Sequence, residues 1–364
     1  MDPQNWDDAK GKARGTKDEI RKLNEHIERV RTIIADGYHQ LIQQKKVITV
    51  DAVKSLFLGT DQNEITLIKL GEYHNTEMKD KLADGTMKNY YTTQKYIAKF
   101  LKEKYHRNDI CLAELNYKFI LDFESYLSKH QPKDHQKPLH NNGIMKHIER
   151  LCKMVNIAIT MDWLVKDPFA KYKQHFDKVE RFYLTKEELS AVENKKFSIE
   201  RLQTVKDLFL FSCYTGLAYI DTMNLTAGNI VKGIDGNDWL ITSRQKTDTD
   251  VRIPLLPQAE ELIKKYHDHP KAVNYGTLFP VISNQKMNAY LKEIADLCNI
   301  NKAITFHIAR HTFATTVTLS NGVPIESVSK MLGHSKLTTT QIYAKVVESK
   351  LADDMARLSE RLGV

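Results

Sequence analysis

The 364-residue sequence lacks the features that mark membrane-spanning and secreted proteins. It has no apolar run near the ~20 residues that a transmembrane helix needs, and its polar N-terminus is unlike a secretory signal. Cysteine is scarce, and no two cysteines form a CxxC pair. We therefore expect a cytoplasmic protein without a membrane partner, whose cysteines are reduced core residues rather than disulfide or zinc ligands. The cysteines are Cys111, Cys152, Cys213 and Cys298.

Basic residues exceed acidic ones along the whole chain. Lysine and arginine number 54 against 46 aspartates and glutamates, which gives a formal net charge of +8. This excess favours a polyanionic partner, although its even spread makes it a weak signal by itself. The length is too great for one ordinary core and predicts two or three domains.

The N-terminal half divides into a first segment over 1–60 and a helical bundle over 61–180. Residues 1–17 are rich in Asp, Lys and Gly and cannot make a core of their own, whereas apolar spacing over 18–44 predicts one long helix. Helical periodicity resumes after residue 61 and predicts a compact bundle. The bundle helices are predicted over 65–84, 86–105, 115–129 and 141–164, with breaks at Gly85, Asn108 and 131–138.

Two helices of this bundle carry basic residues opposite an apolar face. A solvated surface is the simpler interpretation of either face alone, because many surface helices of a lysine-rich protein look like this. Taken together, the two faces are candidates for contact with a polyanion. Their basic residues are Lys88, Lys95, Lys99 and Lys102 on one helix, and Lys146, Arg150 and Lys153 on the other.

The C-terminal half, 181–364, is predicted to be a second folded part that is mainly helical with a small β-sheet. The residues at 185–188 form a capping box, which opens a helix. A strongly apolar helix is predicted over 199–214, and the segments 239–242 and 251–255 are predicted to pair as a β-hairpin. Helices then continue to the C-terminus.

The densest group of chemically capable residues lies between positions 305 and 343. Thr305 is a candidate helix N-cap, which places His307 and Arg310 three residues apart on one helical face. His334 follows a glycine that can end the next helix, so its side chain is free to point into a site. Tyr343 is predicted to lie within the short helix after it.

These residue types suit phosphodiester transfer without a metal. Such a reaction needs a nucleophile, donors that neutralise the charge of the phosphorane, and an acid for the leaving oxygen. Tyr343 offers a phenol, Arg310 a forked guanidinium, and His307 and His334 hydrogen bonds. Lys246, in the predicted hairpin turn, is placed to protonate the leaving oxygen.

The motif His307-x-x-Arg310-His311-Thr-Phe-Ala-Thr, with Leu-Gly-His334 and Tyr343, resembles the signature of the tyrosine recombinases, or phage integrases. The likeness continues in Thr-Gly-Leu-Ala-Tyr-Ile-Asp221 and in Lys246-Thr. It covers the C-terminal half closely and the bundle loosely. The wording Phe-Ser-Cys-Tyr-Thr-Gly-Leu-Ala-Tyr is most similar to integrases of Bacteroides-type conjugative or mobilisable elements.

The resemblance implies a fold, a reaction and partners. It implies a helical, SAM-like core-binding domain over 61–180 and a catalytic domain over 181–364, which clamp duplex DNA. It implies a site-specific recombinase that acts on DNA attachment sites through a 3′-phosphotyrosine and a Holliday junction, to integrate and excise a mobile element. It further implies no cofactor and no obligatory metal, a nucleoid location, and a host DNA-bending factor as a candidate partner.

One position departs from the family pattern. The family usually has an arginine directly after Thr-Gly-Leu, and this chain has Ala218 there. Loss of a guanidinium that contacts the transition state raises the barrier unless another cation replaces it. We predict that Lys206 replaces it, with Arg201 as the second candidate; the alternative interpretation of Lys206 is an ordinary exposed lysine. Asp221 matches the family's acidic position and is expected to orient its neighbours.

Other interpretations compete with these assignments. His311 is most simply a buried, hydrogen-bonded helix residue. His307 and His311 have the spacing of zinc ligands, but a metalloprotease would need Glu where Ile308 stands. A type IB topoisomerase would use the same chemistry but would not need an oligomer-forming tail. The rival from another class is a DNA-binding protein of the same fold that has lost catalysis, which Ala218 favours.

The two ends of the chain carry expectations from the same resemblance. Residues 2–6 and the Lys/Gly stretch after them resemble the tail of an arm-binding domain, so we expect 1–60 to hold its remnant and a coupler helix. At the other end, apolar residues line one side of a terminal helix. That side either packs on its own domain or docks on a neighbouring protomer of a DNA-bound tetramer. These residues are Val347, Leu351, Met355, Leu358 and Leu362.

Overall fold

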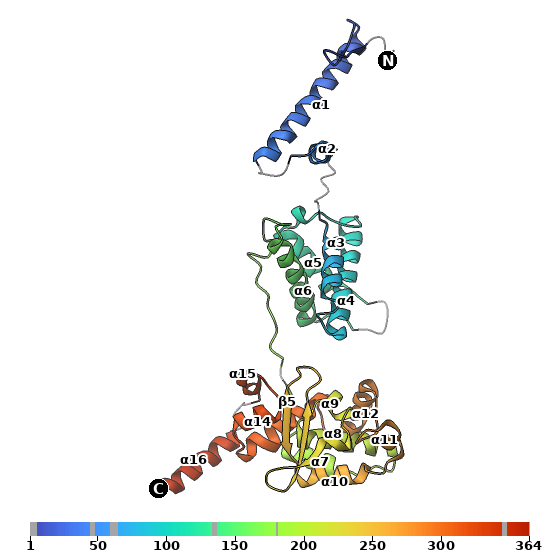
Figure 1. Ribbon diagram of the computed structural model, residues 1–364. Helices are drawn as coiled ribbons and strands as arrows, with labels where there is room; N and C mark the ends of the chain where they lie inside the picture. Colours follow the sequence, from blue (N-terminus) through green and yellow to red (C-terminus); the bar gives the residue numbers. More distant parts are fainter. Residues whose placement is uncertain are drawn as a thin grey trace. The chain divides into compact units, whose positions relative to one another are not determined.

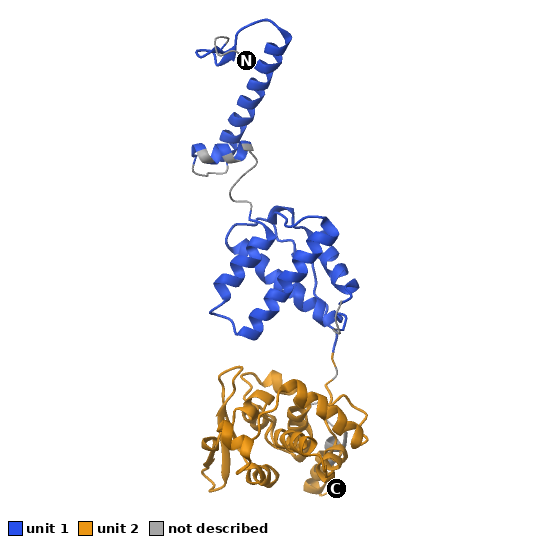
Figure 2. Cartoon of the chain, turned by 90° about the vertical axis from the view of Figure 1, so that its right-hand side faces the viewer, with its two compact units in different colours: residues 1–178 blue, residues 179–364 orange. Residues whose placement is uncertain are grey.

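A computed structural model describes residues 6–43, 48–58, 65–132, 137–179, 181–343 and 348–363. The chain forms two compact units, residues 1–178 and 179–364, which are described separately (Figure 2). Within the described part of the chain, no helix has both the length and the apolar character to cross a bilayer.

The N-terminal part of the first unit consists of a short hairpin and two helices. Strands β1 (Trp6–Asp7) and β2 (Lys12–Ala13) pair antiparallel and precede α1 (Asp18–Gln43) and α2 (Val50–Leu58). The hairpin is held to α1 because Asn24 accepts a hydrogen bond from the Ala13 amide at 2.8 Å and Arg31 donates to the Gly11 carbonyl at 2.8 Å. The long helix predicted over 18–44 is confirmed.

The rest of the first unit is a bundle of helices around an aromatic core. Phe100, Phe119 and Phe123 are almost completely buried, and the rings of Phe119 and Phe123 lie within 5.3 Å of the Phe100 ring. The prediction of a break at Gly85 is wrong, because this residue lies in the first turn of α4, where a helix has few backbone bonds to lose. The helices are α3 (Leu67–Met78), α4 (Asp84–Phe100) with a wide turn over Leu101–Tyr105, α5 (Tyr117–Lys129) and α6 (Asn141–Thr160).

The second unit combines helices with one small antiparallel sheet (Figure 1). The predicted capping box is confirmed, since Thr185 and Glu188 cap each other at the start of α7. The predicted hairpin is also confirmed as β4 (Asp238–Ser243) and β5 (Asp250–Pro254), and an unpredicted strand, β3 (Ile230–Lys232), pairs with β4. The helices are α7 (Lys186–Asn194), α8 (Glu200–Thr215), α9 (Tyr219–Met223), α10 (Pro257–Tyr266), α11 (Pro270–Tyr275), α12 (Asn284–Leu297), α13 (Phe306–Thr312), α14 (Ile325–Met331), α15 (Leu337–Gln341) and α16 (Glu348–Leu362).

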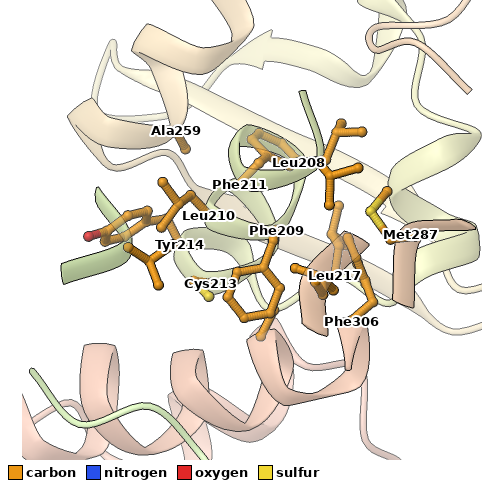
Figure 3. Packing of buried hydrophobic residues seen from close by; sticks show 14 of the residues in the cluster. Leu208, Phe209, Leu210, Phe211, Cys213, Tyr214, Leu217, Ala259, Met287 and Phe306 are labelled. Carbon is orange, nitrogen blue, oxygen red and sulfur yellow. The ribbon is translucent and has the colours of Figure 1, made fainter. Parts of the chain in front are cut away.

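Helix α8 is the centre of the second unit. It is buried on almost every side and contacts α10, α12 and α13. Figure 3 shows its apolar side chains pointing outward in several directions, with Phe209 near Phe306 of α13 and other side chains toward Met287 of α12. A helix that is apolar all round has to be covered on all sides. Its C-terminal end is therefore held firmly, and the candidate site is built on that end.

Candidate active site

Arg310 is a buried cation that joins three segments of the second unit. Its side chain stands in the last turn of α13 and is 3% exposed. Nη1 donates to the Gly216 carbonyl at the end of α8 at 2.6 Å, and Nη2 donates to the Leu332 carbonyl at the end of α14 and lies 3.0 Å from His334 Nε2. Burial, followed by the nearby positive charge of Arg244, lowers the pKa of Arg310 to about 10.

Glycines allow these segments to come so close. Gly216 ends α8 with φ of 71°, and a Cβ atom there would lie 2.5 Å from the Phe313 ring. Gly333 has φ of 61°, and a Cβ atom there would lie 2.6 Å from Cδ of Arg244. Both residues combine a left-handed backbone with a close neighbour, so any larger side chain would push the site apart.

His334 lies where the sequence predicts, just past the end of α14, and its hydrogen bonds define its tautomer. A guanidinium can only donate, so Nε2 accepts from Arg310 and Nδ1 carries the proton. That Nδ1–H then donates to Thr340 Oγ1 at 2.8 Å. Burial, followed by the charges of Arg310 and Arg244, lowers the pKa of His334 to about 4, so the ring is neutral.

Tyr343 is brought to this group, although not from within a helix. The predicted position inside the short helix is wrong, because α15 ends at Gln341 and the Tyr343 amide donates to the Thr340 carbonyl at 2.9 Å in the turn that follows. The side chain is 7% exposed. Its ring is stacked on the His334 ring with centroids 6.1 Å apart, and its centroid lies 4.9 Å from that of His311. Its phenol raises the pKa of Arg310 and so counters part of the lowering by burial.

His307 and His311 meet edge to face, with ring centroids 4.6 Å apart. His311 is buried, as predicted, but its Nδ1 has no hydrogen-bond partner within the described residues, so the expected bond at this atom is not found. Burial is the largest cause of the lowered pKa of both histidines, and the positive charges of Arg310 and Arg181 contribute to it. The pKa of His311 falls to about 4. The site therefore holds its imidazoles neutral.

Lys246 lies in the turn between β4 and β5, as the sequence predicts. The residue is exposed, and its charge contributes to the lowered pKa of His307. Asp221, buried in α9, anchors this turn because its Oδ1 accepts a hydrogen bond from the Gln245 amide at 3.0 Å. The carboxylate thus contacts the backbone of the residue next to Lys246, which fits its expected orienting role.

Lys206 does not join this group, which corrects the prediction that it replaces the cation missing at Ala218. Its ammonium donates to the carbonyls of Glu193 and Lys195 at 3.0 and 2.7 Å, on the connection from α7 to α8. The side chain is buried there and lies near Asp207. The second candidate, Arg201, lies over the ring of Tyr290 instead. Spacing along α8 could not reveal which way either side chain points.

Arg244 is the cation that the sequence analysis missed. It directly follows β4, and its Nη1 donates to the Gly333 carbonyl at 3.2 Å. Its charge contributes to the lowered pKa of Arg310, His307 and His334. The only signal in the sequence was its place two residues before Lys246, and nothing there shows that the side chain turns back toward Gly333.

The two basic faces of the first unit differ in whether their side chains are exposed or have partners within the unit. On α4, Lys88, Lys95 and Lys99 are exposed, and the first two line a hollow with Tyr91 and Thr92. On α6, the basic groups have partners within the unit. Lys146 pairs with Glu149 at 2.7 Å and lies over Phe176, Arg150 donates to Thr93 at 3.5 Å, and Lys153 lies over the ring of Tyr90.

The neutral histidines predict a loss of stability in mild acid. In the folded chain the pKa of His311 and of His334 is about 4, below the ordinary value near 6.5. Between these values the unfolded chain binds more protons, so the stabilisation is present above pH ~6.5 and is lost as pH falls toward ~4. From pH 7 to pH 5 we expect each histidine to lower the free energy of unfolding by on the order of 1 kcal/mol.

Urea unfolding of the full chain at the two pH values measures this effect. His311→Gln should reduce the difference between pH 7 and pH 5, whereas His267→Gln, which changes a histidine with a 74% exposed side chain, should leave it as in the wild type. An unchanged difference in His311→Gln would contradict a neutral buried imidazole at this position.

Each of the two units matches a known protein family. Residues 66–174 match the phage integrase SAM-like domain, and residues 183–350 match the phage integrase family. Tyrosine recombinase XerD of Halalkalibacterium halodurans is 30% identical over 192 residues, which are 49% of this chain and 62% of XerD. Tyrosine recombinase XerC of Listeria welshimeri is 24% identical over 261 residues, which are 67% of this chain and 83% of XerC.

Solved structures share the fold. A lambda integrase dimer bound to a COC′ core site has a TM-score of 0.61 at 18% identity and covers 77% of this chain and 95% of its own. The Tn1549 transposon integrase in complex with a circular intermediate DNA has a TM-score of 0.60 at 15% identity and covers 80% of this chain and 99% of its own. A lambda integrase tetramer bound to a Holliday junction has a TM-score of 0.59 at 17% identity and covers 92% of this chain and 93% of its own. The predicted mainly helical fold, with a SAM-like and a catalytic domain, is thereby confirmed.

Proposed function

Because this chain belongs to the phage integrase family of tyrosine recombinases, we propose that it cleaves and rejoins DNA at specific sites with Tyr343 as its nucleophile. The observation that carries the proposal is the contact of the Tyr343 ring with His311 and His334 beside the buried guanidinium of Arg310. A phenol, a guanidinium and neutral imidazoles are the groups that metal-free phosphodiester transfer needs.

The proposed cleavage step exchanges one phosphodiester for another. The phenolic oxygen of Tyr343 forms a bond to the scissile phosphorus and gives its proton to a neutral imidazole of the site. The bond from phosphorus to the 5′ oxygen breaks, and Lys246 supplies the proton that this oxygen takes up. The 3′-phosphotyrosine is itself a phosphodiester, so a 5′ hydroxyl of another strand can attack it and rejoin the DNA without ATP.

The other residues of the site stabilise this transfer. Arg310 donates hydrogen bonds and charge, and His307 a hydrogen bond, to the non-bridging oxygens as negative charge develops on them. His334 accepts from Arg310 and so orients that guanidinium. Asp221 acts through the backbone of the β4–β5 turn and is a positioning residue for Lys246. We propose this division of roles among the residues of the site when DNA is bound.

In this proposal the first unit binds the DNA duplex. We assign 61–180 to core binding, 181–364 to catalysis and 1–60 to a remnant arm-binding segment with its coupler helix. The exposed lysines of α4 are the better placed contacts with phosphates, because several basic groups of α6 already have partners within the unit. The duplex substrates are attachment sites of a mobile element, which the chain integrates and excises through a Holliday junction.

Assembly of four protomers is proposed to use α16. Three of the apolar residues predicted on its docking side are exposed, Met355 at 61%, Leu358 at 45% and Leu362 at 68%. Val347 lies outside the described residues, as does the side chain of Leu351. An apolar side that is not covered suits docking on a neighbouring protomer. A host factor that bends DNA would assist the assembly.

A nicked duplex separates this function from a DNA-binding protein that has lost catalysis. The substrate carries the attachment site of the element that encodes this chain, with a nick just 3′ of the cleavage point. After cleavage the short fragment diffuses away, so rejoining stops and covalent protein–DNA adduct accumulates. Adduct on a denaturing gel supports the recombinase, and a gel shift without adduct supports the binding protein.

Lys246 is expected to act as the general acid. Lys246→Ala should slow single-turnover cleavage by about 10²–10⁴-fold, because the 5′ oxygen then leaves without a proton. A substrate with sulfur in place of that bridging oxygen releases a thiolate, which needs no proton, so the variant should cleave it at nearly the wild-type rate. Lys264→Ala, which changes an exposed lysine of α10, is the control. An equal loss on both substrates would contradict this role.

A further inference from the structure

Arg244 presents a guanidinium whose hydrogen-bonding capacity is largely unused. Its aliphatic stem packs against Gly333, where a Cβ atom would lie 2.6 Å from Cδ of Arg244. Nη1 donates to the Gly333 carbonyl at 3.2 Å, whereas Nε is buried and has no hydrogen-bond partner within the described residues. A buried N–H without an acceptor is unfavourable, so the position favours an acceptor that comes from outside the chain.

The surroundings of Arg244 carry an excess of positive charge. Arg244 lowers the pKa of Arg310, which means that the two guanidiniums repel each other. Lys246 adds a third positive charge to the same group. Asp221 is a carboxylate whose charge raises the pKa of Arg310, and its Oδ1 already accepts a hydrogen bond from the Gln245 amide. An anion placed between the guanidiniums would relieve this repulsion.

Arg310 alone is poorly placed to hold both non-bridging oxygens of a phosphate. Its Nη1 and Nη2 groups already donate to the carbonyls of Gly216 and Leu332 and to His334. Ala218, two residues beyond Gly216 at the start of α9, has no side-chain donor to add. Arg244 is the guanidinium near Arg310 that retains free donors.

We propose that Arg244 binds a non-bridging oxygen of the scissile phosphate and, with Arg310, completes a two-guanidinium clamp. The proposal rests on the proposed strand-transfer function and names a further catalytic residue for it. Arg244 and Lys246 stand on one turn, whose backbone Asp221 anchors through Gln245. Charge neutralisation and the proton for the leaving oxygen are therefore delivered by the same hairpin.

The test compares variants of Arg244 on the nicked duplex in single-turnover cleavage. Arg244→Ala should be slower than wild type by about 10²–10³-fold, the loss typical of one preorganised donor to a transition state. Arg244→Lys, which keeps the charge but not the fork, should lie between them. Arg252→Ala is the matched control, because Arg252 is an exposed arginine of β5 in the same sheet, and it should cleave as wild type does.

A substrate with a neutral methylphosphonate at the scissile position distinguishes charge neutralisation from a loss of structure. The methyl group replaces one charged oxygen, so the cation is no longer needed, and Arg244→Ala should cleave this substrate at close to the wild-type rate. In a second arm, Ala218→Arg added to Arg244→Ala should restore much of the cleavage of ordinary DNA, since position 218 lies beside Gly216. A misfolded variant would cleave the methylphosphonate substrate slowly, and adding Ala218→Arg would not restore its cleavage of ordinary DNA.

The outcomes are distinct from those that test the function itself. Wild-type adduct with a slow Arg244→Ala that recovers on methylphosphonate supports the clamp. Wild-type adduct with an Arg244→Ala that cleaves ordinary DNA at the wild-type rate, or that is equally slow on both substrates, overturns it. Absence of adduct in the wild type would overturn the proposed function instead.

Discussion

Tyr343→Phe is expected to form no covalent adduct with the nicked duplex while it still binds DNA. The substitution removes one oxygen atom, the nucleophile, and leaves the ring that packs on His311 and His334. Loss of the phenol's interaction with Arg310 should change the free energy of unfolding by only about 1 kcal/mol. The effect on chemistry is therefore complete and the effect on folding is small.

The measurement pairs a denaturing gel for adduct with a gel shift for binding. Tyr219→Phe is the matched control, because it removes another hydroxyl of the same unit, one that donates to the Ile282 carbonyl at 2.6 Å. The control should form adduct. Adduct formation by Tyr343→Phe at the wild-type level would show that another residue is the nucleophile.

Arg310→Ala is expected to have the second largest effect, on chemistry and on stability together. Removal of the guanidinium takes away a donor to the transition state, which slows cleavage by about 10²–10³-fold or more. It also leaves the buried carbonyls of Gly216 and Leu332 without their donor, and each unsatisfied group costs about 1–3 kcal/mol. Arg310→Lys should recover part of the stability but little of the rate, because an ammonium cannot reach both carbonyls in the same plane.

Urea unfolding and single-turnover cleavage, measured on the same preparations, separate the two effects of Arg310. Arg201→Ala is the control, because Arg201 has a half-exposed side chain over Tyr290 and lies in the same unit. A stable Arg310→Lys protein that cleaves at the wild-type rate would contradict a direct role for the guanidinium.

The sequence predicted most elements of the fold because their signals are local. The long helix α1, the capping box at Thr185 and the hairpin of β4 and β5 follow from periodicity, capping and turn chemistry. Strand β3 was missed because it has only three residues and is defined by its pairing with β4 rather than by its own pattern. The predicted break at Gly85 was wrong because a glycine in the first turn of a helix disrupts few backbone hydrogen bonds.

The site was predictable where residues share one element and unpredictable where side chains reach across elements. His307 and Arg310 lie on one short helix, so their spacing carried the information. Lys206 lies on the helix that leads into the site, but its side chain turns to the carbonyls of Glu193 and Lys195. Arg244 reaches Gly333, which lies 89 residues away in the chain. No local sequence pattern shows which way the side chain of Lys206 or of Arg244 points.

Identification of the residue bound to DNA tests the central claim most directly. The adduct from the nicked duplex would be digested with trypsin and nuclease, and the peptide that retains a nucleotide would be sequenced by mass spectrometry. We predict the peptide over 337–345 with the nucleotide on the Tyr343 oxygen. A nucleotide on any other residue, or a wild-type chain that binds the attachment site and yields no nucleotide-bearing peptide, would contradict the account.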